Sequence, residues 1–149
     1  ASAAAALHET ASNRSIEVPR VRELSQRLRA GIATVAPESV VVGEASERLA
    51  GINSVAFPGC QADALLMLLD SVGVACSAGS ACTAGVPRPS HVLLAMGVPS
   101  DQAQRTLRFS LGWNSQPSDV DALIAALPAV LERARRANRG GSRVAAGAS

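Results

Sequence analysis

The stretch INSVAFPGCQADALLMLLDSVGVAC, from Ile52 to Cys76, carries the pattern that decides the fold class. Its first six residues favour a strand, which a Pro-Gly turn signal ends. ADALLMLLD, residues 62–70, predicts a short and largely buried helix, and residues 72–76 predict a further strand. A strand, a helix and a strand in so short a span indicate a small sheet covered by helices.

The same alternation of elements continues on both sides of this stretch. Val21, Leu24, Leu28 and Ile32 recur at helical spacing and predict an amphipathic helix. This helix runs from Pro19 to about Gly31. The other predicted elements are a strand at 40–42, a helix at 91–96 with Ser90 as N-cap, a strand at 106–111, and a last helix from Pro117 with a kink or restart at Pro128.

This order of elements predicts the α/β (α+β) class, with a small sheet covered by helices. The chain divides into three parts by composition. Residues 1–18 are small and polar without periodicity, which predicts a flexible tether. Residues 19–137 form the predicted domain, and residues 138–149, which are Arg, Gly, Ala, Ser and Val with one Asn, form a predicted disordered tail.

Composition limits the chemistry that the chain can perform. It has 149 residues, of which 48% are hydrophobic, enough to bury a core. The formal net charge is +2, and all fourteen basic residues are arginine. The absence of lysine excludes a Schiff-base lysine, a Walker-type phosphate loop and a Ser–Lys dyad within these residues. Lysine-dependent chemistry would need a lysine from elsewhere.

The three cysteines, Cys60, Cys76 and Cys82, are too few and of the wrong parity for a disulfide framework. They form no C-x-x-C pair and have no metal-ligand spacing with the histidines, so we expect no structural zinc site. No apolar run approaches the length of a membrane span, and the Ala-rich start does not resemble a signal peptide. We therefore expect a reducing, cytoplasmic setting without membrane contact.

Cys82 is the candidate nucleophile. It lies in the run SAGSACTAG, residues 77–85, whose small side chains predict an exposed and mobile loop. A thiolate on such a loop can reach a substrate and deliver its cargo elsewhere; the alternative is an inert cysteine in a glycine-rich loop. Cys60 and Cys76 are interpreted as structural, as is His91 in the first turn of a predicted helix.

Arg108 is the candidate substrate-binding residue, because it lies in the middle of a predicted strand, between Leu107 and Phe109. Its planar guanidinium matches a carboxylate in a bidentate manner, while the alternative is a solvated residue on the outer face. The arginines near the C-terminus lie at a predicted helix end and have no aromatic residues between them. This favours a solvated helix end over a nucleic-acid site.

Five segments in order resemble the C-terminal small domain of a cysteine desulfurase of the pyridoxal-phosphate-dependent class-V aminotransferase superfamily. They are INSVAFPG, ADALLMLLD, SAGSACTAG, PSHVLLAMG and LRFSLG, all between Leu49 and Asp121. The cysteine-containing segment is similar to the group that serves iron–sulfur assembly. The other group, with its Arg-x-Gly-x-His-Cys signature, is not matched.

The resemblance implies a role for each matching residue. Cys82 would attack the sulfur of pyridoxal-bound L-cysteine, become a persulfide, release alanine and pass the sulfur to an iron–sulfur scaffold or another acceptor. In some complexes of the family this cysteine also helps to ligate an iron–sulfur cluster. The resemblance thus implies that Cys82 could ligate such a cluster, and it implies no other metal site. Arg108 would grip the substrate carboxylate, and the intact protein would be a homodimer.

The family's large domain, with its cofactor-binding lysine, has no counterpart in these residues. We therefore expect the chain to be a C-terminal fragment that neither holds pyridoxal phosphate nor desulfurates cysteine alone. Two other interpretations stay open. One is a separate module that relays persulfide sulfur or docks on a scaffold, and the other is a class-V aminotransferase-like protein without desulfurase activity.

Overall fold

The computed structural model of the chain describes residues 3–42, 50–78, 80–83, 86–89 and 91–147. For residues 3–17, 80–83, 86–89 and 144–146 it describes the backbone alone. The helices are α1 (Ala3–Val35), α2 (Ala62–Ser71), α3 (His91–Ala95), α4 (Ser100–Ala103) and α5 (Pro117–Ala146). The strands are β1 (Val40–Val41), β2 (Ile52–Ala56), β3 (Ser77–Ala78), β4 (Ser80–Thr83), β5 (Val86–Pro89) and β6 (Thr106–Ser110).

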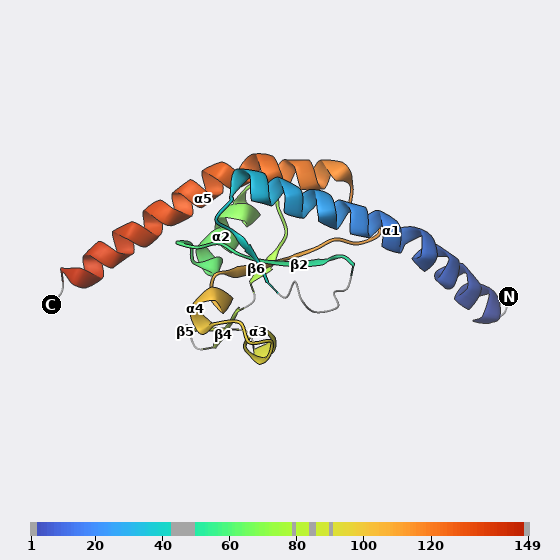
Figure 1. Cartoon of the computed structure of the whole chain (residues 1–149), viewed down its shortest axis with the longest axis horizontal. Helices are drawn as coiled ribbons and strands as arrows, with labels where there is room; N and C mark the ends of the chain where they lie inside the picture. Colours follow the sequence, from blue (N-terminus) through green and yellow to red (C-terminus); the bar gives the residue numbers. More distant parts are fainter. Residues whose placement is uncertain (1–2, 43–49, 79, 84–85, 90, 148–149) are drawn as a thin grey trace.

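Four of these strands form an antiparallel sheet in the order β1-β2-β6-β3, and β4 and β5 form a separate hairpin. The long helices α1 and α5 lie side by side over one face of the sheet (Figure 1). The short helices α3 and α4 and the β4–β5 hairpin lie on the other side (Figure 1). The predicted mixed class, a small sheet covered by helices, is confirmed.

The main core lies between the sheet and the helices α1, α2 and α5. Each of these elements contributes fully buried apolar side chains at the spacing that its secondary structure requires. They include Leu28 and Ile32 from α1, Leu65 and Leu69 from α2, Val55 and Leu107 from the sheet, and Leu127 and Leu131 from α5. A smaller cluster of Val42, Ala56, Leu93 and Ala103 attaches α3 and α4 to the opposite face.

The structure differs from the sequence prediction at both ends of the chain. The first helix does not begin at Pro19 but includes residues 3–18, and the last helix continues through 138–146. The Ala-rich start has high helix propensity, which explains how α1 extends beyond the proline. The last helix also passes Pro128 without a restart, and its axis bends in Figure 1. The domain boundaries themselves stay a prediction.

The strand predicted at residues 72–76 is wrong. After α2 the chain turns, because the amides of Val72 and Val74 both donate to the carbonyl of Leu69, and Gly73 has a φ of 83°. These bonds satisfy the last carbonyls of the helix, a C-cap that glycine makes possible. The strand therefore begins at Ser77. Among the described residues, no helix combines the length and apolar character needed to cross a membrane.

Candidate functional site

Arg108 lies on the face of the sheet that α1 and α5 do not cover. Along β6, Leu107 and Phe109 are buried while Arg108 and Ser110 are exposed. Successive side chains of a strand point to opposite faces, so the buried pair faces the helices and Arg108 faces away from them. The exposure of Arg108 is compatible with both sequence interpretations, a carboxylate-binding residue and a solvated residue on the outer face.

Two serines flank Arg108 on the neighbouring strands. The register places Ser54 of β2 directly opposite Arg108 on one side and Ser77 of β3 directly opposite on the other. The Nε–H of Arg108 donates a hydrogen bond to the Oγ of Ser77 at 3.2 Å. The guanidinium is therefore held toward β3, with a hydroxyl-bearing residue on each side and no charged residue directly opposite.

The backbone of Cys82 belongs to a hairpin and not to the loop that the sequence predicts. Cys82 is the third residue of β4 and is paired with Pro87 of β5. The small, weakly strand-forming side chains of residues 77–85 concealed this pairing, which depends on the partner strand. The side chain of Cys82 lies outside the part of the chain that the structure describes, so its exposure stays a prediction.

The chain connects the two candidate residues through Ser77. Cys82 follows Ser77 by five residues, which even when fully extended span at most about 18 Å. The thiol-bearing strand is thus tethered close to the residue that contacts Arg108. Such a connection allows a nucleophile and an anion-binding group to serve one substrate.

The other residues singled out from the sequence lie apart from Arg108. Cys60 is fully buried, and its thiol donates to the carbonyl of Leu131 at 4.0 Å. Burial raises the pKa of Cys60, and it also raises the pKa of the half-buried Cys76, to about 11. Both thiols are thus protonated at neutral pH, which agrees with their structural interpretation. His91 begins α3 and is exposed, so its side chain is not part of the core.

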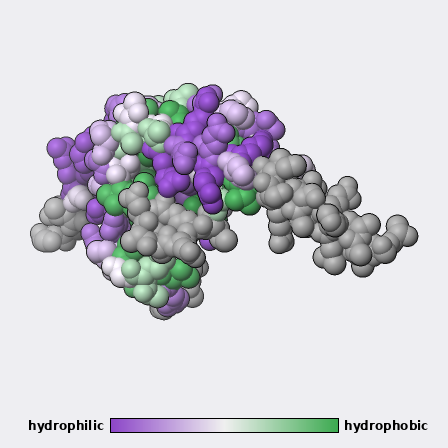
Figure 2. Space-filling view, turned by 45° about the vertical axis from the view of Figure 1, so that its right-hand side comes forward, coloured by the Kyte–Doolittle hydropathy of each residue, from purple (hydrophilic) through white to green (hydrophobic). Residues whose placement is uncertain are grey.

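The surface beside the hairpin is apolar. The helix α3 follows β5 after one residue and leaves Val92 and Leu94 exposed by 68% and 39%, and Met96, directly after the helix, is exposed by 46%. Figure 2 shows hydrophobic colour at the lower end of the molecule, where Figure 1 places α3. A partner that approaches α3 would therefore meet the apolar side chains of Val92, Leu94 and Met96 beside the exposed His91.

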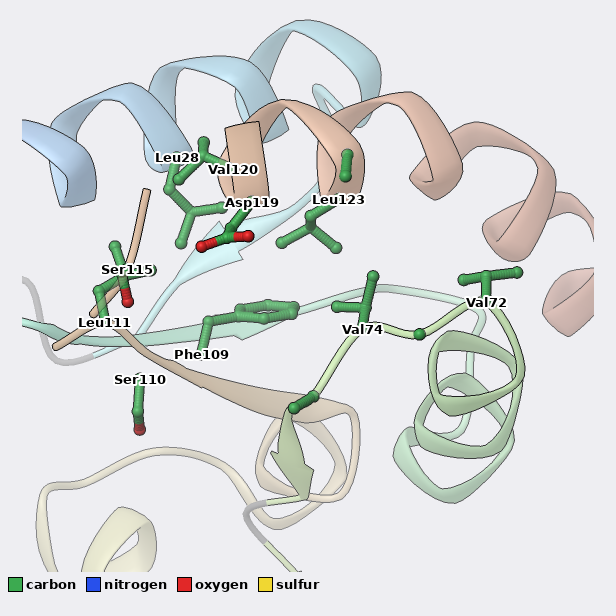
Figure 3. A pocket seen from close by; sticks show the side chains of 13 residues that line it. Leu28, Val72, Val74, Phe109, Ser110, Leu111, Ser115, Asp119, Val120 and Leu123 are labelled. Carbon is green, nitrogen blue, oxygen red and sulfur yellow. The ribbon is translucent and has the colours of Figure 1, made fainter. Parts of the chain in front are cut away.

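A pocket of about 300 Å³, which the sequence did not reveal, lies on the opposite face of the sheet. Figure 3 shows it between the two long helices above and Phe109 below, with Ser110 directed away from it. Its one charged lining residue is Asp119, whose Oδ2 accepts a hydrogen bond from the amide of Gln116 at 2.8 Å. An apolar pocket whose one charged group is a carboxylate has no cation to bind an anionic group such as a phosphate.

Ser77 is the site residue that sequence reasoning missed. It stands 31 residues before Arg108, and only the pairing of β3 with β6 brings the two together. Among the described residues there is also no group of three or more histidine, cysteine or acidic side chains that could hold a metal ion. The site in this chain is therefore an arginine with a hydroxyl partner, next to a cysteine-bearing hairpin.

Comparison with known proteins identifies the class to which this fold and these residues belong. Residues 2–123 match the family model of aminotransferase class-V, and the chain belongs to that family. A solved structure, the NifS-like protein from Rickettsia africae, superposes with a TM-score of 0.70 at 25% identity, covering 81% of this chain and 31% of that one.

Within this family the chain is similar to cysteine desulfurases. An IscS-like cysteine desulfurase of Mycobacterium tuberculosis is 50% identical over 131 residues, and the match covers 87% of this chain and 32% of that protein. The cysteine desulfurase NifS of Azotobacter vinelandii is 39% identical over 119 residues, covering 80% and 30%. The chain thus spans about a third of the length of the curated relatives that it matches, and the resemblance stated from the sequence is confirmed.

Proposed function

We propose that this chain is the sulfur-accepting and substrate-binding part of a cysteine desulfurase. In the overall reaction the Cys82 thiol and L-cysteine give a Cys82 persulfide and L-alanine. The carbon–sulfur bond of the substrate breaks, a sulfur–sulfur bond forms on Cys82, and a hydrogen takes the place of sulfur on the alanine carbon. Atoms and electrons balance in this overall reaction, so it consumes no external oxidant or reductant.

The observation that carries the proposal is Arg108 on the open sheet face, held by Ser77 five residues before Cys82. A guanidinium that keeps its charge at every physiological pH suits a substrate carboxylate, which is likewise always charged. The similarity to cysteine desulfurases over most of the chain supports the same assignment. The carboxylate of L-cysteine would bind to Arg108 while the thiol of Cys82 attacks the sulfur of the same molecule.

The residues of this chain do not fit pyridoxal phosphate, the cofactor that the family implies. The chain has no lysine to hold it covalently, and the pocket beside Phe109 has a carboxylate where the phosphate would need a cation. The cofactor would therefore be held by another part of the intact enzyme.

The acceptor of the persulfide sulfur would be a protein, an iron–sulfur scaffold in the simplest case. Direct transfer requires a thiolate of the acceptor to reach the outer sulfur of the Cys82 persulfide. The exposed apolar residues of α3 beside the hairpin provide a surface for that contact. A homodimeric intact enzyme, a cytoplasmic setting and cluster ligation by Cys82 stay predictions that follow from the resemblance.

The test uses the full-length enzyme that contains this sequence, with Cys82→Ser and the matched control Cys76→Ser. After incubation of the wild-type enzyme with L-cysteine, intact mass and peptide mapping should show a gain of one sulfur atom on Cys82. The control should keep both this gain and alanine formation, because Cys76 is half-buried and protonated. Persistence of the sulfur gain and of alanine formation in Cys82→Ser would refute the assignment.

A further inference from the structure

The guanidinium of Arg108 has two ways to grip a carboxylate with paired hydrogen bonds. It can use Nε together with one terminal nitrogen, or it can use the two terminal nitrogens, Nη1 and Nη2. In this structure the Nε–H already donates to Ser77 Oγ at 3.2 Å. The pair that stays available for a ligand is therefore Nη1 and Nη2.

The pairing of β3 with β6 sets the position of Ser77. This pairing places Ser77 directly opposite Arg108, and residues in such positions have adjacent side chains. The Ser77 side chain is half-buried, while that of Arg108 is exposed. The half-buried hydroxyl can thus orient the long, rotatable arginine side chain before any ligand arrives, which reduces the entropy lost on binding.

We infer that Ser77 is a positioning residue that directs the terminal nitrogens of Arg108 toward the substrate carboxylate. The inference rests on the proposed function, in which Arg108 binds that carboxylate. Ser77 would touch neither the substrate nor the reacting sulfur. Its effect would appear in the binding of every ligand with the same carboxylate and not in the chemical step.

The two serines that flank Arg108 provide a matched comparison. Ser54 of β2 and Ser77 of β3 both stand directly opposite Arg108. The Nε–H of Arg108 donates its hydrogen bond to Ser77. Removing the hydroxyl of Ser54 should therefore leave carboxylate binding unchanged. A general effect of polarity on this face would make both serines equally important.

The experiment measures steady-state alanine formation in the full-length enzyme. Ser77→Ala should raise the KM for L-cysteine about three- to tenfold and raise the inhibition constant of L-alanine by the same factor, with kcat changed less than twofold. L-alanine is a suitable probe because it has the carboxylate and lacks the reacting thiol. The Ser54→Ala control should match the wild type in all three constants.

A second pair of variants separates the hydroxyl from the shape of the side chain. Ser77→Thr and Ser77→Val introduce side chains of nearly equal size that both suit a strand, and only threonine has a hydroxyl. Threonine should keep the wild-type KM, whereas valine should behave like alanine. Equal KM values for these two variants would overturn the inference, even if Ser77→Ala fails to fold.

The outcome for Arg108 distinguishes this inference from the proposed function. If Arg108→Ala leaves the KM for L-cysteine unchanged, the carboxylate is bound elsewhere and the proposed role of Arg108 fails. If Arg108→Ala raises the KM strongly while Ser77→Ala does not, the proposed role stands and the positioning role of Ser77 is refuted.

Discussion

The close approach of Gly51 to β6 predicts that Gly51→Ala will destabilise the fold. The amide of Leu111 donates to the carbonyl of Gly51 at 2.7 Å, which extends the pairing of β2 with β6. A Cβ on Gly51 would collide with the carbonyl oxygen of Leu111 and lie 3.0 Å from Cγ1 of Val21. Because the main obstacle is backbone, the two strand ends must separate to admit a methyl group.

The expected magnitude follows from three contributions. Overpacking against a fixed neighbour costs about 1–3 kcal/mol, and the weakened hydrogen bond of Leu111 costs about 1 kcal/mol. Alanine returns about 0.4–1 kcal/mol by restricting the unfolded chain. The free energy of unfolding should thus decrease by about 1–4 kcal/mol. Urea unfolding of the chain, followed by far-ultraviolet circular dichroism, measures this change as a lower midpoint.

A second glycine serves as the control for this prediction. At Gly112 an added Cβ would find its nearest neighbour, Asn114 Oδ1, at the ordinary distance of 3.6 Å. Gly112→Ala should therefore lie within about 0.5 kcal/mol of the wild type, as is usual for surface substitutions. If Gly51→Ala were equally neutral, the strand ends would not be packed as described, and the argument for close approach would be refuted.

Three further predictions concern the thiols, the last helix and the helix pair. Burial raises the pKa of the Cys76 thiol to about 11, so its alkylation should stay slow at pH 8. The free energy of unfolding should be constant below about pH 9, the pKa of this thiol in the unfolded chain, and should decrease as the pH approaches 11. An alkylation rate and a urea midpoint that do not vary from pH 7 to 11 would contradict this. A Cβ added at Gly140 or Gly141 would find no atom within 4 Å. Gly140→Ala and Gly141→Ala should therefore each stabilise α5 by about 0.5–1 kcal/mol, measured as increased helical dichroism. Unchanged dichroism would count against a helix there. Arg27→Ala removes an exposed ion pair between α1 and α5 and should cost less than about 1 kcal/mol by urea unfolding, whereas a larger loss would indicate that the pair is buried in solution.

Several elements could be predicted because their signals are local. The strands at β2 and β6 and the helix α2 follow from short apolar patterns ended by proline or glycine, and the structure confirms them. The strand predicted at 72–76 failed because the same apolar residues complete a helix C-cap at Gly73. The Cys82 hairpin was missed because small residues have little intrinsic preference for strands.

For the candidate site, the sequence by itself determined the residue types: an arginine in the middle of a strand and a cysteine among small residues. Alternation along β6 determined that Arg108 shares a face with Ser110 and not with the core. Only the tertiary structure decided that Ser77 meets Arg108. That contact depends on the register between strands 31 residues apart, and a shift of one residue would have turned Ser77 to the other face.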